Sequence, residues 1–197
     1  MDRGELVDRL VREQGISSEI AAAFRAVPRE EFLPLWARSQ AYSDSAISIG
    51  HGATNSQPSM LAIMLKELEL EPGMKVLEVG SGSGYLLALL SCVGVEATGV
   101  EIVRSLAEAS MVTLARLGVE AKVIVGNAGE VSLSELYDRV VFSAAIASTP
   151  DWATGLLAPG GFVLAPVGHE HQQELIRADG ATKTPTGRLC RFVRFVD

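Results

Sequence analysis

The middle of the chain, from about residue 73 to residue 168, alternates short apolar runs with segments of helical periodicity. Short runs rich in Val, Ile and Leu are typical of buried strands. Strands separated by helices form parallel βαβ units with right-handed crossovers. We therefore predict an α/β protein with a Rossmann-like, doubly wound and mainly parallel sheet that carries helices on both faces. The predicted strands are 75–79, 97–101, 121–125, 139–143 and 161–167, and the predicted helices are 85–93, 104–117 and 151–157.

Two further zones flank this core and differ from it in pattern. Residues 1–72 carry apolar positions at helical spacing, which predicts an N-terminal helical segment. Their stretch 40–56 is small, polar and rich in Gly, and a loop of this length in a compact protein is usually functional. Residues 169–197 lack helical spacing and predict antiparallel edge strands, the last over 189–196. We expect these zones and the core at 73–168 to form a single domain.

The composition excludes several classes of protein. The chain has 24 Asp and Glu against 17 Lys and Arg, and a net charge of −7 argues against a general nucleic-acid binder. Two cysteines are too few for a disulfide framework, and the charged N-terminus is unlike a signal peptide. No apolar stretch approaches the roughly 20 residues that span a membrane. We expect a soluble, cytoplasmic monomer with neither nucleic acid nor a membrane as its partner.

A glycine-rich segment, Gly80-Ser-Gly-Ser-Gly84, lies between a predicted strand and a predicted helix. Glycines at this place allow a tight turn and let a ligand approach the backbone closely. Glu101 ends the next predicted strand, 21 residues after Gly80, where a carboxylate can accept both hydroxyls of a ribose. An acidic residue, Glu78, stands two positions before the first glycine. The pattern predicts a ligand that contains a nucleoside.

Two ligand classes compete for this loop. A dinucleotide loop of the form G-x-G-x-x-G needs glycine at position 85, where this chain has Tyr85. The Glu78 carboxylate repels a pyrophosphate but suits an ammonium group. S-adenosyl-L-methionine carries an ammonium group, a sulfonium and a ribose but no phosphate, so charge favours it over NAD. A glycine turn that binds no cofactor is the remaining alternative, since the sequence has no P-loop and no G-x-S-x-G motif.

The three histidines are weaker candidates. His169 and His171 lie two positions apart, so they share one face of a predicted strand and are a candidate metal pair. No third ligand lies near them in the sequence. We interpret both as surface residues and expect no metal. A lone histidine in a glycine-rich loop, His51, is interpreted as structural.

Several longer segments match a known family. The matching segments are Val27-Pro-Arg-Glu-Glu-Phe-Leu-Pro34, Ala41-Tyr-Ser-Asp44, Ile49-Gly-His-Gly-Ala-Thr-Asn-Ser-Gln-Pro58, the glycine loop, Leu157-Ala-Pro-Gly-Gly161, Pro166-Val-Gly168 and Val193-Arg-Phe-Val196. Through these segments the whole chain resembles the protein-L-isoaspartate (D-aspartate) O-methyltransferases, a branch of the S-adenosylmethionine-dependent class I methyltransferases. The Val-Pro-Arg segment and the Ala-Thr-x-Ser-x-Pro loop are far more specific to this family than the glycine motif.

The resemblance implies a role for individual residues. It implies that Ser56 is the active-site serine, and that Ala53, Thr54 and Asn55 hold the backbone of the isoaspartyl substrate. The residues that it implies for binding S-adenosyl-L-methionine are Glu78, Gly80, Ser81, Gly82, Glu101, Ile102, Asn127 and Ala128. Ser56 is also a candidate N-cap for a helix that begins near Pro58, and the two roles are compatible.

The resemblance also implies a reaction. A methyl group passes to the carboxylate of an L-isoaspartyl or D-aspartyl residue in a damaged peptide or protein, which initiates repair and leaves S-adenosyl-L-homocysteine. The carboxylate is already an anion near neutral pH, so the reaction needs no strong general base. We expect Ser56 to donate a hydrogen bond that orients this carboxylate. A nicotinamide-dependent oxidoreductase is disfavoured by Tyr85 and Glu78.

The chain departs from the family pattern at three places. Asn55 stands where the family usually has an apolar residue, often Ile, and Asn127-Ala128 stands where an Asp-Gly pair is usual near the adenine. The chain also ends at Asp197, so we expect it to lack the short tail of other members. These departures leave an alternative hypothesis, a paralogue that binds S-adenosyl-L-methionine but methylates another carboxylate or serves as a non-catalytic binding module.

Overall fold

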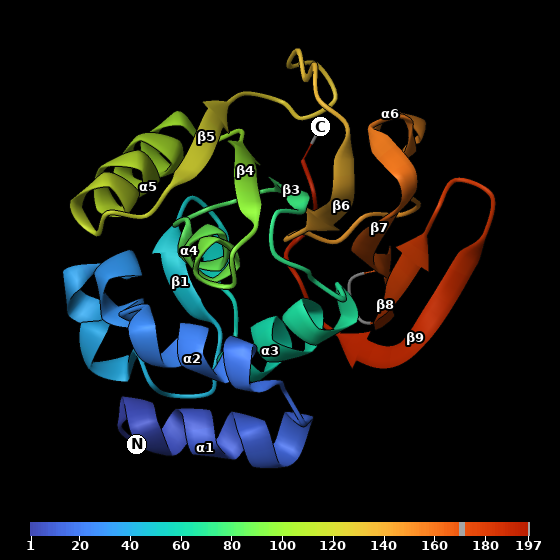
Figure 1. Ribbon diagram of the computed structural model, residues 1–197. Coiled ribbons are helices and arrows are strands. Elements are labelled where there is room, and N and C mark those ends of the chain that lie inside the picture. The colour runs from blue at the N-terminus through green and yellow to red at the C-terminus, as the bar shows by residue number, and fades with distance from the viewer. Residues whose placement is uncertain (170–171, 197) are drawn as a thin grey trace.

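The computed structural model describes residues 1–169 and 172–196, so two residues discussed above, His171 and Asp197, lie outside the described residues. Within those ranges the centre is a seven-stranded sheet in the order β5-β4-β3-β6-β7-β8-β9 (Figure 1). Its strands are β3 (Lys75–Val79), β4 (Glu96–Glu101), β5 (Ala121–Val125), β6 (Tyr137–Phe142), β7 (Leu157–His169), β8 (Gln172–Ala178) and β9 (Lys183–Cys190). Strands β3 to β7 pair in parallel, whereas β8 and β9 are antiparallel. This confirms the predicted mainly parallel sheet with antiparallel edge strands.

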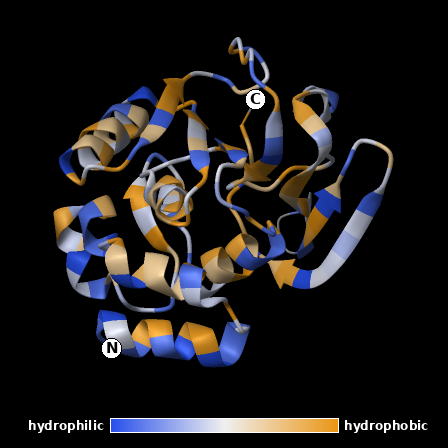
Figure 2. Cartoon of the chain, in the orientation of Figure 1, coloured by the Kyte–Doolittle hydropathy of each residue, from blue (hydrophilic) through white to orange (hydrophobic). Residues whose placement is uncertain are grey.

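Helices cover both faces of this sheet, as predicted. They are α1 (Arg3–Gln14), α2 (Ser18–Ala26), α3 (Pro58–Glu67), α4 (Tyr85–Cys92), α5 (Arg104–Arg116) and α6 (Asp151–Gly155), with short 3₁₀ helices η1 (Arg29–Phe32) and η2 (Leu35–Gln40). Helix α1 shows in Figure 2 the mixture of apolar and polar residues of an amphipathic helix. No helix in the described part of the chain combines the length and apolarity that crossing a membrane requires.

The alternation of side chains along the strands creates two separate cores. In β3, Val76 packs with helices α1 to α4 on one face, and its neighbour Leu77 packs with α6 on the other. Both residues are fully buried. The same alternation places Glu78 and Val79, at the end of β3, on opposite faces of the sheet.

The segment 40–56, predicted to be a loop, contains a small hairpin. Strands β1 (Ile47–Gly50) and β2 (Ala53–Asn55) pair antiparallel and form a separate two-stranded sheet. The turn between them is tight because Gly50, His51 and Gly52 all have positive φ angles. The sequence did not reveal these strands because they are only three and four residues long and lack clear apolar alternation.

The predicted last strand over 189–196 is wrong, because β9 ends at Cys190. Residues 191–196 instead run past the loop that follows β6. The Ala145 N–H donates to the Val193 carbonyl (2.7 Å), and the Phe195 N–H donates to the Ala145 carbonyl (2.8 Å). The Phe195 ring packs edge-on against Phe142, with 5.7 Å between ring centroids. The apolar residues of this segment therefore face the carboxyl edge of the sheet instead of extending it.

The strand order sets where a ligand can bind. From β3 the chain builds outward through β4 and β5, then returns to place β6 on the other side of β3. The loops that leave the carboxyl ends of β3 and β6 therefore diverge, and in open α/β sheets this switch point is where ligands bind.

Candidate cofactor and substrate site

The glycine loop leaves β3 at this switch point. Gly80, Gly82 and Gly84 have φ angles of 80°, 52° and 82°, a region that favours glycine. The loop also needs a glycine beneath it, because a Cβ added to Gly99 of β4 would lie 2.8 Å from the Cβ of Ser81. The sequence thus lets the backbone turn sharply from β3 into α4 and lie directly on the sheet.

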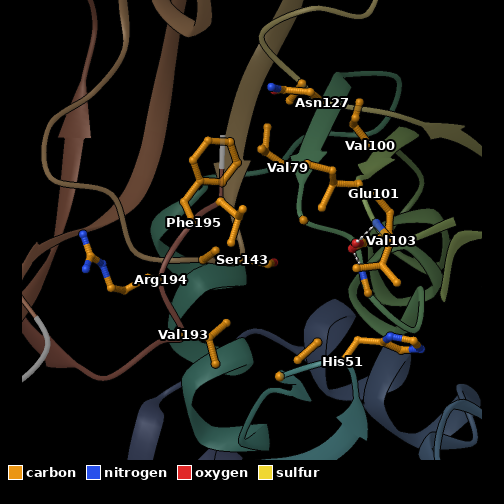
Figure 3. A pocket seen from close by; sticks show the side chains of 18 of the residues that line it. His51, Val79, Val100, Glu101, Val103, Asn127, Ser143, Val193, Arg194 and Phe195 are labelled. Atoms are coloured by element: carbon orange, nitrogen blue, oxygen red, sulfur yellow. Dashed lines mark hydrogen bonds between the residues drawn. The ribbon is translucent and has the colours of Figure 1, made fainter. Parts of the chain in front are cut away.

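A cavity of about 280 Å³ opens at the carboxyl ends of β3, β4 and β6 (Figure 3). This volume is close to the lower end of the range for small-molecule sites, roughly 300–1,000 Å³. Among the residues predicted to bind cofactor or substrate, the cavity is lined by Gly80, Gly82, Glu101, Ile102, Asn127, Ala128, Ala53 and Thr54. The structure therefore brings together residues from the hairpin, the glycine loop and the turns after β4 and β5.

Glu101 is a fixed acceptor on the wall of this cavity. Its side chain is buried, its Oε2 accepts from the Gly82 N–H (2.7 Å), and its Oε1 accepts from the Val103 N–H (2.8 Å) (Figure 3). A carboxylate oxygen has two lone pairs, so each oxygen can accept one further hydrogen bond. The carboxylate is thus held in one orientation and retains the capacity to bind two neighbouring hydroxyl groups.

A second cavity, of about 30 Å³, lies beside the glycine loop and is lined by Glu78, Ser81, Ser143 and Ser56 among others. The Ser143 hydroxyl donates to Glu78 Oε1 (2.7 Å). Within the described residues, Glu78 Oε2 and the Ser81 hydroxyl are buried without a hydrogen-bond partner. A buried acceptor without a partner is unusual and marks a place where a ligand can donate.

The environment of Glu78 changes its ionisation. Burial raises the pKa of its carboxyl group to about 8, the hydrogen bond from Ser143 opposes this shift, and the negative charge of Glu101 adds to it. Without a ligand, the Glu78 side chain is therefore mostly protonated at neutral pH. A cation in the small cavity would favour the charged form and lower this pKa.

The turn after β5 supplies a hydrogen-bond donor. The Asn127 Oδ1 accepts from the Gly129 N–H (3.0 Å), which leaves the amide NH₂ of Asn127 to donate to a ligand. Ala128 is buried and lines the same cavity. Asn127-Ala128, the pair that departs from the family pattern and for which the resemblance implies a contact with adenine, therefore lines the large cavity.

Residues 53–56, the substrate loop that the resemblance implies, lie between the two cavities. Ala53 and Thr54 line the large cavity, while Thr54, Asn55 and Ser56 line the small one. The interpretation of Ser56 as a helix cap is wrong, because the N-cap of α3 is Gln57 and no side chain caps this end. The half-buried Ser56 side chain is thus not needed for capping.

Arg29 holds this loop, a role that was not predicted from the sequence. Its side chain is completely buried, and burial lowers its pKa to about 10, so it stays charged at neutral pH. Its guanidinium donates to the carbonyls of Ala41, Ser43, Ser45, Asn55 and Ser56 and to the Asn55 side chain. The match of the Val-Pro-Arg segment to the family pattern singled out this arginine but did not indicate which groups it contacts.

Two further segments line the large cavity and were not predicted to belong to a site. His51 lines it, is exposed, and lies 3.1 Å from the Ser105 hydroxyl through its Nε2, which joins the hairpin to α5. Residues 193–196 line it from the C-terminal side, with Phe195 beside the β3 end and Arg194 directed away from it (Figure 3). The match of residues 193–196 to the family pattern did not by itself indicate that they line a cavity.

Comparison with known proteins agrees with this geometry. A family model described as Protein-L-isoaspartate(D-aspartate) O-methyltransferase (PCMT) matches residues 1–197. A protein-L-isoaspartate O-methyltransferase of Methanoculleus marisnigri is 36% identical over 196 residues, which cover 96% of this chain and 89% of the relative. One of Methanopyrus kandleri is 39% identical, with 96% of this chain and 85% of the relative covered.

A solved structure is similar over the whole length. It is described as a protein-L-isoaspartate O-methyltransferase from Plasmodium falciparum in complex with S-adenosyl-L-homocysteine. The two chains are 25% identical, align with a TM-score of 0.86, and are each 98% covered. The chain therefore belongs to the protein-L-isoaspartate (D-aspartate) O-methyltransferase family.

Proposed function

We propose that this chain transfers the methyl group of S-adenosyl-L-methionine to the free carboxylate of an L-isoaspartyl or D-aspartyl residue in a damaged peptide or protein. Family membership over the full length supports this function. The observation that carries it is the meeting of two loops, because Ser56 and Glu78 line the same small cavity directly beside the larger one. The methyl acceptor and the methyl donor would meet there.

The residues present fit S-adenosyl-L-methionine. Glu101 has acceptor capacity for the ribose hydroxyls, and the Asn127 amide on the wall of the large cavity suits an acceptor on adenine. The unpartnered Oε2 of Glu78 suits the ammonium group. In this proposal Gly80, Ser81 and Gly82 contact the cofactor closely, and Ile102 and Ala128 pack against it.

The protein's part in the reaction is to position the substrate and exclude water. When bound, the cofactor supplies an electrophilic methyl group, which a carboxylate oxygen accepts without prior deprotonation. In this proposal the backbone of Ala53, Thr54 and Asn55 holds the isoaspartyl backbone, and the Ser56 hydroxyl donates a hydrogen bond that orients the carboxylate. Arg29 keeps Ser56 in place through its carbonyl.

We also propose how the chain is organised and where it acts. Residues 1–197 act as one methyltransferase domain, in which 1–72 cover the substrate, 73–168 bind the cofactor and 169–197 complete the sheet. The protein works in the cytoplasm as a monomer on peptides and proteins, with neither nucleic acid nor a membrane as its partner. The net charge of −7 and two free cysteines, both in the described part of the chain, support this setting.

Calorimetric titration tests the cofactor assignment. We expect S-adenosyl-L-homocysteine to bind with one site per chain and NAD not to bind, since the buried Oε2 of Glu78 suits an ammonium group and Tyr85 stands where a dinucleotide loop needs glycine. Binding of NAD in preference to S-adenosyl-L-homocysteine would contradict the assignment.

Ser56→Ala tests the role of the substrate loop. A hydroxyl that only orients the substrate contributes one hydrogen bond to the transition state, so we expect kcat to fall about 10- to 100-fold. The affinity for S-adenosyl-L-homocysteine should change less than twofold. The measurements are methyl transfer to an isoaspartyl peptide and calorimetric binding, and unchanged turnover would remove Ser56 from the mechanism.

A further inference from the structure

The side chain of Asn55 joins the substrate loop to the glycine loop. It is 3% exposed, its Nδ2 donates to the Ser83 hydroxyl (3.1 Å), and its Oδ1 accepts from Arg29 Nε (3.0 Å). Arginine has only donors, so the amide oxygen must face Arg29 and the amide nitrogen must face Ser83. Both ends of the Asn55 side chain are therefore committed to protein contacts.

Arg29 links Asn55 to the rest of the substrate loop. Its Nη2 donates to the carbonyl of Ser56 (2.9 Å) and, at 3.4 Å, to that of Asn55 itself. The same guanidinium binds the carbonyls of Ala41, Ser43 and Ser45. A displacement of Asn55 is thus transmitted to Ser56 through one shared, buried cation.

The glycine loop and the hairpin also touch beside this hydrogen bond. A Cβ added to Gly82 would lie 3.3 Å from Ile49 Cδ1, so the hairpin packs directly over the loop. Gly82 donates its N–H to Glu101, and Ser83 follows it in the chain. A ligand that binds Glu101 therefore contacts the same loop that carries Ser83, the partner of Asn55.

From this chain of contacts we propose that Asn55 is a positioning residue that couples the cofactor site to the substrate loop. Occupation of the cofactor site fixes Ser83, Ser83 fixes Asn55, and Asn55 with Arg29 fixes Ser56. Because Asn55 joins the two loops, a first ligand that restrains one loop also restrains the other, so the second ligand binds more tightly. By linkage, the cofactor and the peptide increase each other's affinity by the same factor. This inference rests on the proposed function.

The coupling is measured by titrating an isoaspartyl peptide into the protein with and without saturating S-adenosyl-L-homocysteine. We expect the wild-type protein to bind the peptide at least about fivefold more tightly with the cofactor product, the effect of one hydrogen bond. Ser83→Ala should bring this ratio close to one and raise KM for the peptide. Ser83→Thr, which keeps the hydroxyl, should restore the ratio.

Matched variants separate coupling from a general loss of structure. Ser83 precedes α4, whereas Ser91 lies in the last turn of this helix. Ser91→Ala should therefore leave the affinity ratio unchanged. Asn55→Leu should bring the affinity ratio close to one, and the double variant with Ser83→Ala should have the same ratio as Asn55→Leu alone. Additive effects of the two substitutions would contradict the proposed coupling between Asn55 and Ser83. If Asn55→Leu lowers Tm too far for binding experiments, Ser83→Ala and Ser83→Thr decide the question.

The outcomes distinguish this inference from the function on which it rests. A wild-type protein that methylates the peptide but shows a ratio of one, or a Ser83→Ala variant that keeps the wild-type ratio, overturns the coupling. A wild-type protein that binds S-adenosyl-L-homocysteine but never methylates the isoaspartyl peptide overturns the proposed function instead.

Discussion

Replacing Glu78 with glutamine is expected to weaken the binding of S-adenosyl-L-homocysteine about 30- to 100-fold at pH 8. A hydrogen bond to a charged group contributes roughly 1.5–3 kcal/mol, and glutamine cannot supply the charge. The buried Oε2 of Glu78, which lacks a partner among the described residues, is the proposed acceptor for the ammonium group. Calorimetry of the wild-type and variant proteins measures the difference.

The same variant should remove a pH dependence. The pKa of Glu78 is about 8 without ligand, because burial raises it, and a bound cation lowers it. Below pH 8, binding must therefore release a proton, and wild-type affinity should rise as the pH is raised from 6 to 8. Glu78→Gln should show no such rise. A flat wild-type profile, or no proton release in buffers of different ionisation enthalpy, would contradict the role of Glu78.

Stability measurements show whether the loss of binding reflects a loss of structure. The folded-state pKa of Glu78 lies above its unfolded value, so the folded protein holds an extra proton between about pH 4.5 and pH 8. Stability of the ligand-free protein therefore falls as pH rises through this window. Relative to the wild-type protein, Glu78→Gln should therefore be more stable at pH 8 than it is at pH 5. Its effect on binding goes the other way, because the variant binds S-adenosyl-L-homocysteine more weakly at pH 8.

Replacing Arg29 with methionine is expected to lower the free energy of unfolding by about 3–5 kcal/mol and to abolish methyl transfer. The guanidinium is completely buried and serves acceptors on several loop residues, and each acceptor left buried without a partner costs about 1–3 kcal/mol. Urea unfolding and a methyl-transfer assay measure the two effects. Arg29→Lys, with fewer donors in a different geometry, should fall between the two proteins.

Arg25→Met is the matched control for this experiment. Arg25 forms an ion pair with Asp8 at 2.8 Å, but the two side chains are 51% and 69% exposed. Exposed pairs contribute little, so this variant should lose less than about 1 kcal/mol. If Arg29→Met lowered the free energy of unfolding by as little as Arg25→Met, this would contradict the role of Arg29 in holding the substrate loop.

Local patterns were sufficient to predict the fold core. The strands Lys75–Val79 and Ala121–Val125 are short runs made mainly of Val, Leu and Ile between helical segments, and this alternation predicts a parallel sheet. The antiparallel edge was predicted from the absence of helical spacing. Its last strand was misplaced because Val193 and Phe195 alternate like strand residues but find their apolar contacts at the cavity and Phe142.

The sequence predicted only those parts of the candidate site that can be recognised within one continuous segment. Gly80 to Gly84 and Glu101 follow strand ends, so the sequence places them at one edge of the sheet, and the structure has them there. The partners of Arg29 lie 12 to 27 positions further along the chain and are mainly loop carbonyls, which every residue possesses. No sequence pattern identifies such acceptors, so the hydrogen bonds from Arg29 to these loop carbonyls became visible only in the folded chain.

The most direct test is methyl transfer from S-adenosyl-L-methionine to an isoaspartyl peptide, with the same peptide carrying a normal aspartyl residue as the control. The proposed function predicts that methyl ester forms on the isoaspartyl peptide alone and that its rate falls in Ser56→Ala. Binding of S-adenosyl-L-homocysteine without transfer to the isoaspartyl peptide, or equal transfer to both peptides, would contradict it.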